Sequence, residues 1–175
     1  MSSMTKRGTI DIVVETPKGS RCKFTFDEEH RSFRLKSILP AGASFPYDFG
    51  FIPGTKADDR DPLDVLLLVD APTCTGCIVE ARLIGVLEAE QVENGEVERN
   101  DRIIAVASES KDYEDINTFK ELNGNFQDEL AHFFVSYNQA RGKEFRILDR
   151  KGPAAAWKLV KKAKLKQKKK RKASK

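Results

Sequence analysis

Residues 57–69 read Ala-Asp-Asp-Arg-Asp-Pro-Leu-Asp-Val-Leu-Leu-Leu-Val, an acidic loop that runs directly into an apolar segment. The apolar part, Leu63–Val69, is nearly continuous, which is typical of a strand buried on both faces. The residues before it, from Ala41 to Pro62, are rich in Gly, Pro and Asp and therefore predict a loop. The stretch as a whole predicts a central strand with a carboxylate-rich loop at its entrance.

Short β-branched or aromatic runs on both sides of this segment predict further strands. They are Thr9–Glu15, Arg21–Phe26 and Phe33–Leu39 upstream, and Ile78–Leu87, Ile103–Ala107 and Phe145–Leu148 downstream. The segment Glu88–Asp101 is polar and acidic with one glycine, so we expect an exposed hairpin loop there.

The hydrophobic period changes in the second half of the chain. Apolar side chains recur at helical spacing within Asn125–Ala140, at Phe126, Leu130, Phe133, Phe134 and Tyr137. Gly152-Pro153 opens a final helix that we expect to run to about Lys164. Short strands followed by late helices predict a mainly β (α+β) fold, a small closed or partly open antiparallel OB-like β-barrel with two or three helices packed outside.

The charge is divided unevenly along the 175 residues. Eleven of the 31 lysines and arginines follow Trp157, so residues 1–157 carry 20 cationic against 27 acidic side chains, about −7. We therefore expect one barrel domain over residues 1–157 and a basic helix end and tail over residues 158–175. The tail is interpreted as a solvated end; binding to nucleic acid or an anionic surface, or docking on a neighbouring subunit, remain alternatives.

The lack of a recognisable targeting signal and the small number of cysteines lead us to expect a cytoplasmic location. No run of 18 apolar residues exists, so no transmembrane helix is expected, and the first residues lack the apolar region of a secretory signal. Three cysteines do not suggest a disulfide framework. Cys74-Thr75-Gly76-Cys77 lies between two strand-like runs, and we interpret it as a turn rather than a zinc or redox motif.

The acidic loop is the candidate site for chemistry. Four carboxylates fall within seven consecutive positions, at Asp58, Asp59, Asp61 and Asp64. Like charges this close repel one another. A divalent cation would relieve the repulsion, and ligands that are all oxygen favour Mg²⁺, with Mn²⁺ possible, over zinc. Spacing alone leaves a solvated acidic turn as an equal alternative.

Three motifs in order carry a resemblance to a known family. Phe45-Pro-Tyr-Asp-Phe-Gly-Phe-Ile-Pro53, followed by Asp59-Arg-Asp-Pro-Leu-Asp-Val-Leu66, resembles the signature region of the family I inorganic pyrophosphatases. Val14–Arg21 with Lys23 is similar to that family's first hairpin, and Ala131-His-Phe-Phe134 with Tyr137 to its main helix. The resemblance extends from about residue 9 to residue 149.

The resemblance implies a homo-oligomeric enzyme that hydrolyses pyrophosphate to two phosphates with water activated by divalent metals. By position, Asp59 and Asp64 would be metal ligands, and Asp61 would contact metal and orient or deprotonate the attacking water. Glu15 would belong to the outer metal sphere. Phosphate oxygens would be contacted by Lys23, Arg102 and Tyr137.

Several positions depart from the family pattern. Uncharged residues replace cations at Ser37 (usually Arg) and Asn138 (usually Lys), and replace acids at Thr25 and Asn100, although Asn100 can still offer a metal its amide oxygen. Gln91 stands where a further acid is usual, but the loop is longer here, so Glu90, Glu93 or Glu96 is an alternative for that place. Other changes are Phe45 and Phe49 for Tyr, Arg102 for Lys, and Arg60 for Gly. Arg60 would either contact phosphate in place of a missing cation or face solvent beside Asp58.

These departures imply fewer and weaker metal sites, and they keep two rival functions open. One is a pyrophosphatase-like binding module with weak, redirected or lost catalysis. The other is a hydrolase of a related phosphoanhydride or phosphoester. Catalysis on pyrophosphate ranks first, because a module freed from catalysis has little reason to keep a repulsive cluster of carboxylates.

Overall fold

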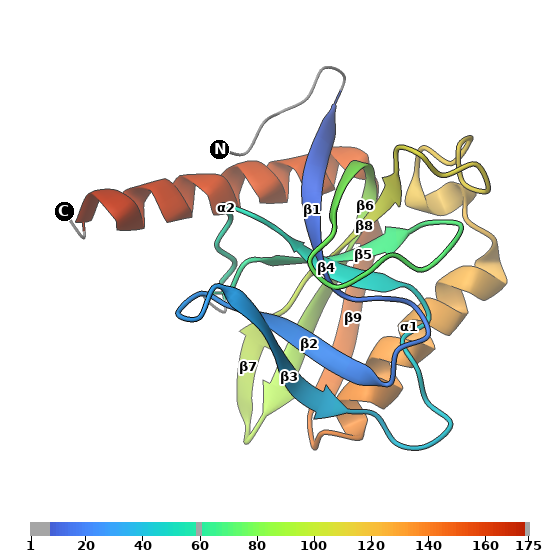
Figure 1. Cartoon of the computed structure of the whole chain (residues 1–175), viewed down its shortest axis with the longest axis horizontal. Helices are drawn as coiled ribbons and strands as arrows, with labels where there is room; N and C mark the ends of the chain where they lie inside the picture. The colour runs from blue at the N-terminus through green and yellow to red at the C-terminus, as the bar shows by residue number, and fades with distance from the viewer. Residues whose placement is uncertain (1–7, 59–60, 174–175) are drawn as a thin grey trace.

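The computed structural model describes residues 8–58 and 61–173. The fold is mainly β, with helices late in the chain (Figure 1). In chain order the elements are β1 (Thr9–Thr16), β2 (Cys22–Asp27), β3 (Ser32–Ile38), β4 (Asp48–Ile52), β5 (Leu63–Leu68), β6 (Ile78–Glu93), β7 (Glu96–Arg99), β8 (Arg102–Ala107), the 3-10 helix η1 (Phe119–Glu121), α1 (Gly124–Gln139), β9 (Glu144–Lys151) and α2 (Pro153–Ala173).

Five of these strands close into a ring. They hydrogen-bond in the order β1-β4-β5-β8-β6, and β6 pairs with β1 to complete the circle. The expected closed β architecture with helices outside is therefore confirmed. One pair differs from the antiparallel expectation: β5 and β8 are parallel, because β6 carries the chain back and β8 starts at the same end as β5. Strands β2 and β3 form a separate two-stranded sheet.

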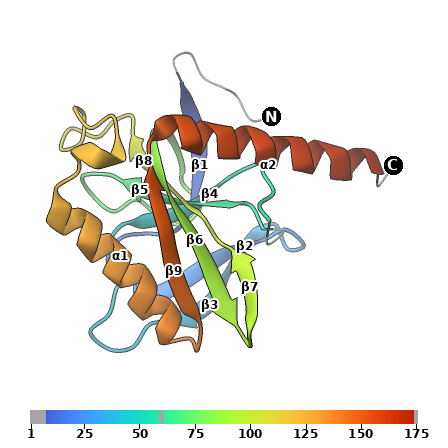
Figure 2. The ribbon, with the colours of Figure 1, turned by 180° about the vertical axis from the view of Figure 1, so that it is seen from behind.

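The continuous apolar character of β5 is explained by burial on two faces. Val65 and Leu67 pack in one cluster with Val160 of α2, whereas Leu66 and Leu68 pack in another with Phe134 of α1. Alternate residues of β5 thus pack against α2 and against α1, and Figure 2 shows the two helices from behind. This arrangement fixes the entrance of β5 between the two helices.

The hairpin expected over Glu88–Asp101 is present, but it consists of paired strands rather than a loop. Strand β6 continues to Glu93 and pairs with β7 through a turn at Asn94-Gly95, where φ is 52° and 81°. Asn-Gly with positive φ is the preferred tight hairpin turn. The acidic residues are tolerated in the strand because cations pair with them: Lys151 lies 2.8 Å from Glu88, and Lys143 lies 2.8 Å from Glu93.

The last helix is longer than expected. Helix α2 runs from Pro153 to Ala173 rather than to about Lys164. Its sequence after Pro153 contains no further Gly or Pro, and Ala, Leu, Lys and Gln all favour helix. The second half of the helix extends beyond the strands (Figure 1).

Candidate active site

A cavity of about 620 Å³ lies at the entrance of β5. Its lining includes all the described residues that the sequence selected: Glu15, Lys23, Asp61, Asp64, Asn100, Arg102 and Tyr137. They come from β1, β2, the loop before β5, β5 itself, the segment before β8, β8 and α1. The other two selected residues, Asp59 and Arg60, lie outside the described residues, so the two hypotheses for Arg60 stay open.

Thr55 holds the acidic loop against the sheet. Its buried hydroxyl donates to the Ile52 carbonyl at 2.5 Å and accepts from the Leu63 amide at 3.0 Å. One side chain therefore ties the end of β4 to the start of β5. The loop returns to this point with the carboxylates of Asp61 and Asp64 at the cavity.

Asp58 lies in a neighbouring pocket, which it lines together with Asp64 and residues of α2. Lys166 of α2 hydrogen-bonds its carboxylate, and Lys162 lies 3.9 Å from it. The hydrogen bond from Lys166 is the main reason that the pKa of Asp58 is lowered. Asp58 therefore attaches the loop to α2.

Arg102 pairs with one of the expected metal ligands. Because β5 and β8 are parallel neighbours, its Nη1 lies 2.5 Å from Oδ2 of Asp64. The guanidinium lies beside the stacked rings of Phe134 and Phe145, at 5.7 and 5.9 Å from their centroids, and the side chain is only 12% exposed. Arg102 also donates to the amide oxygen of Asn100. A cation thus lies against both Asp64 and Asn100.

Two amides stand together where the family pattern has acids. Nδ2 of Asn100 donates to Oε1 of Gln91 at 3.0 Å. This bond directs the Asn100 oxygen toward Arg102 and Asp64. Of the nearby acids, Glu93 is bound by Lys143 and Glu90 lies 3.6 Å from Arg146, whereas Glu98, opposite Gln91 on β7, lines the cavity.

Glu15 is the most buried of the expected acids. Its carboxylate accepts from the Phe26 amide at 2.7 Å and from the Thr25 hydroxyl at 3.2 Å. Burial raises its pKa, and the negative charge of Asp64 adds to the rise, while the Phe26 amide and Lys23 oppose it. Thr25 therefore supports Glu15 with a hydrogen bond where the family pattern has a second acid.

Tyr137 lies between two cations. Nζ of Lys23 is 5.2 Å from the ring centroid, and the guanidinium carbon of Arg141 is 5.3 Å from it. Arg141 also donates to the Tyr137 hydroxyl at 2.8 Å. Sequence reasoning missed Arg141; the available signal was a cation four positions after Tyr137, one helical turn further on.

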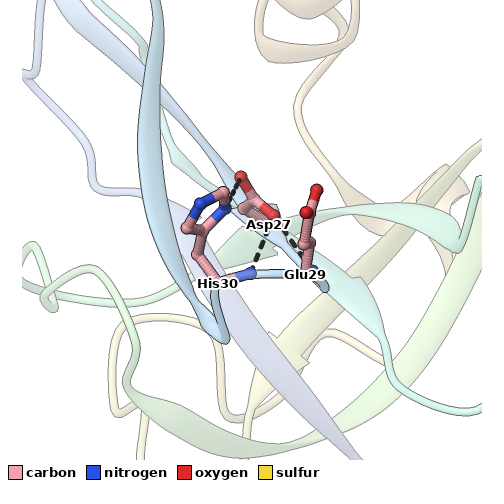
Figure 3. Close-up of side chains that lie close together, drawn as sticks. All are labelled: Asp27, Glu29 and His30. Atoms are coloured by element: carbon pink, nitrogen blue, oxygen red, sulfur yellow. Dashed lines mark hydrogen bonds and ion pairs between the residues drawn. The ribbon is translucent and has the colours of Figure 1, made fainter.

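A second acidic group is structural. Asp27, Glu29 and His30 are, within residues 8–58 and 61–173, the one trio whose ligand atoms all lie within 4.8 Å (Figure 3). Arg34 holds the Asp27 carboxylate at 2.7 and 3.0 Å, and the Glu29 and His30 amides also bond to it. These bonds, with Arg34 first, lower the pKa of Asp27. The cluster shapes the turn between β2 and β3.

Sequence and structure comparisons agree on the family. The model of the inorganic pyrophosphatase family matches residues 12–168. The chain belongs to the inorganic pyrophosphatase family. The pyrophosphatase of Synechocystis sp. is 39% identical over 155 residues, covering 89% of each chain. That of Halalkalibacterium halodurans is 35% identical, covering 86% of this chain and 90% of the relative.

Solved pyrophosphatases share the fold along nearly the whole length. The Thermus thermophilus structure has a TM-score of 0.86 at 27% identity and covers 96% of both chains. The Neisseria gonorrhoeae structure has a TM-score of 0.82 at 31% identity and covers 92% of both. No helix among the described residues is long and apolar enough to cross a membrane.

Pyrophosphatases of this family depend on metal, and the donor set here fits a hard divalent cation. Glu15, Asp61, Asp64 and Asn100 offer only oxygen atoms and share one cavity. The guanidinium of Arg102 against Asp64 shows that positive charge is stabilised at that point. Without Asp59, the described carboxylates of the cavity do not form a trio within 4.8 Å.

Proposed function

We propose that this pyrophosphatase hydrolyses inorganic pyrophosphate to two phosphates with Mg²⁺, and that Mn²⁺ can replace it. The observation that carries the proposal is the shared cavity, in which Asp61 and Asp64 meet Lys23, Arg102 and Tyr137. Carboxylates alone would repel a polyanion, and cations alone would bind it without activating water. The two sets together suit a metal-bound phosphoanhydride.

The metal, when bound, would neutralise phosphoryl oxygens and lower the pKa of water. Asp59, Asp64 and the Asn100 oxygen would hold it, and Glu15 would act from the outer sphere. Asp61 would contact metal and accept the proton of the attacking water. Lys23, Arg102 and Tyr137 would donate to phosphate oxygens, and Arg60 is a further candidate for such a contact.

Arg102 has a double task in this proposal. Its guanidinium now contacts the carboxylate of Asp64, and the same side chain would donate to phosphate. With its charge balanced by a bound cation, Asp64 would attract Arg102 less strongly. Arg102 is then free to direct donors to the substrate, while Phe134 and Phe145 keep its guanidinium in place.

Phosphate release from pyrophosphate, with Mg²⁺, with Mn²⁺ and with chelator, tests the proposal. Asp61→Asn should lower kcat by about 10²–10³-fold, a range typical for one preorganised polar group. Asp149→Asn is the matched control, since this exposed carboxylate on β9 lies outside the cavity. Absence of release with either metal would overturn the proposal, and release from nucleotides alone would assign a different substrate.

Assembly and location are finer parts of the proposal. We infer a cytoplasmic homo-oligomer, which light scattering of the purified protein and imaging of a tagged chain would test. The predicted body of residues 1–157 and tail of residues 158–175 meet inside α2, where Val160 and Ala163 are buried. Deleting residues 166–175 therefore tests the tail without opening the core. Unchanged retention on RNA or heparin at low salt would exclude nucleic-acid binding by the tail.

A further inference from the structure

Two positions where the family pattern carries cations hold no charge in this cavity region. Asn138 is 3% exposed, and its Nδ2 donates to the Phe134 carbonyl at 2.8 Å. The Ser37 hydroxyl is buried and has no hydrogen-bond partner among the described residues. Asn138 is committed to its own helix and Ser37 is too short to carry charge outward. Neither residue can offer a polyanionic substrate a positive charge.

Arg141 reaches the same cavity from just beyond the end of α1. Its backbone amide bonds to the Asn138 carbonyl at 2.9 Å, which continues the helical turn and keeps Arg141 on the side of Tyr137. Nη1 then donates to the Tyr137 hydroxyl at 2.8 Å. The guanidinium is thus placed one turn beyond Asn138 by a backbone bond and a side-chain bond.

The charge of Arg141 is not neutralised within the described part of the chain. Arg34, Arg99 and Arg146 each contact a carboxylate, whereas the contacts of Arg141 are with the Tyr137 hydroxyl and ring. Lys23 lies over the same ring and also makes no ion pair there. The two cations lie 5.2 and 5.3 Å from the ring centroid, so an anion bound at the Tyr137 hydroxyl would be attracted by both.

We propose that Arg141 binds a phosphate group of the substrate and supplies the positive charge that Ser37 and Asn138 lack. This inference rests on the proposed function. A guanidinium presents several N–H donors in a planar fork that matches phosphate oxygens. Because the Tyr137 oxygen accepts from Arg141, its own O–H remains free to donate to the same phosphate. Arg141 therefore both binds substrate and orients Tyr137.

Arg141→Gln and Arg141→Lys test the proposal, with Arg150→Gln as the matched control. Arg150 is a comparably exposed arginine on β9, outside the cavity and 3.8 Å from Asp128. Three quantities are measured: KM and kcat for pyrophosphate, and the Kd of imidodiphosphate by calorimetry with Mg²⁺ present. Circular dichroism and the urea midpoint establish that each variant is folded.

Arg141→Gln should raise KM and the imidodiphosphate Kd about 10- to 100-fold, the effect of losing one charged hydrogen-bond donor. Arg141→Lys should recover part of the loss, and Arg150→Gln should match the wild type. A wild-type Kd for folded Arg141→Gln would overturn the inference. If Arg141→Gln does not fold, Arg141→Met takes its place, and a wild-type Kd for that uncharged variant would overturn the inference equally.

The two proposals fail in different ways. If the wild type hydrolyses pyrophosphate and Arg141→Gln does so with unchanged KM, the inference about Arg141 is wrong and the proposed function stands. If the wild type releases no phosphate but Arg141→Gln weakens imidodiphosphate binding, the phosphate site stands and the proposed function is wrong.

Discussion

Asp48 provides a test of what holds the active-site strand in place. It starts β4 and is fully buried, and β4 leads into residues 51–55, which line the cavity. Its carboxylate accepts from the Lys18 amide at 2.7 Å, the Thr73 amide at 3.1 Å and the Thr73 hydroxyl at 2.6 Å. Asp48 therefore joins β4 to two loops that are distant in the sequence.

The magnitude follows from these three bonds. A hydrogen bond to a charged group contributes about 1.5–3 kcal/mol, and a buried donor left unpaired costs about 1–3 kcal/mol. Asp48→Ala removes all three bonds, and since such terms are not additive we expect a loss of about 3–5 kcal/mol. Asp48→Asn keeps one oxygen but turns an NH₂ group toward a donor, so we expect about 2 kcal/mol.

Urea denaturation of the two variants measures the free energy of unfolding. Thr73→Val, which removes only the hydroxyl, completes a double-mutant cycle, and it should cost less in Asp48→Ala than in the wild type. A loss below about 1 kcal/mol for Asp48→Ala would place it among ordinary surface substitutions and refute the reasoning. If Thr73→Val costs the same in both backgrounds, the hydrogen bond between the Thr73 hydroxyl and the Asp48 carboxylate contributes nothing to stability.

Three further perturbations have defined outcomes. Gly50→Ala should lower the Tm sharply, because a Cβ there would lie 2.2 Å from the Val13 carbonyl oxygen. Gly124→Ala is the control and should leave the Tm nearly unchanged, because a Cβ there would meet nothing within 4 Å. Equal Tm values for the two variants would contradict this reasoning. The Ser110 hydroxyl, with the Lys111 and Asp112 amides, lowers the pKa of Asp70 below its ordinary 3.8. The stability that these hydrogen bonds contribute is present above the ordinary pKa and is lost as the pH falls through the lower pKa of the folded state. Asp70→Asn should therefore lessen the fall of the urea midpoint at acid pH. An identical fall in the variant and the wild type would show that Asp70 has no such effect. Mg²⁺ at about 100 times its Kd should stabilise the protein by about 2.7 kcal/mol and raise the Tm by several degrees. Asp64→Asn should reduce this rise in Tm. A Tm that changes with neither Mg²⁺ nor chelator would mean that the folded state does not bind metal.

Local sequence patterns predicted those elements of the fold whose structure depends on residues nearby in the sequence. The apolar run at Leu63–Leu68 predicted a strand buried on both faces, and the helical spacing of Leu130 and Phe134 predicted the face that α1 buries. The acidic segment after Glu88 was correctly expected to form a hairpin, but its strand structure was not predicted. Its strand structure depends on β9, whose Lys151 arrives from more than sixty positions away and neutralises Glu88.

The candidate site likewise has a part that the sequence predicted and a part that it did not. The order of the motifs determined the family and selected residues that line one cavity, because residue type and spacing carry the chemistry of ligands and donors. Spacing did not show that Arg102 would pair with Asp64, since that contact depends on the parallel pairing of β5 with β8.

By itself, then, the sequence determined the type of most elements, the family and the residue types of the site. The tertiary structure decided which charges meet. It turned Asn138 into its helix, directed Arg141 onto Tyr137 and paired the acids of β6 with cations of β9 and its approach. The physical reason is that Coulomb and hydrogen-bond energies depend on distances of a few ångströms between groups far apart in the chain, and only folding sets those distances.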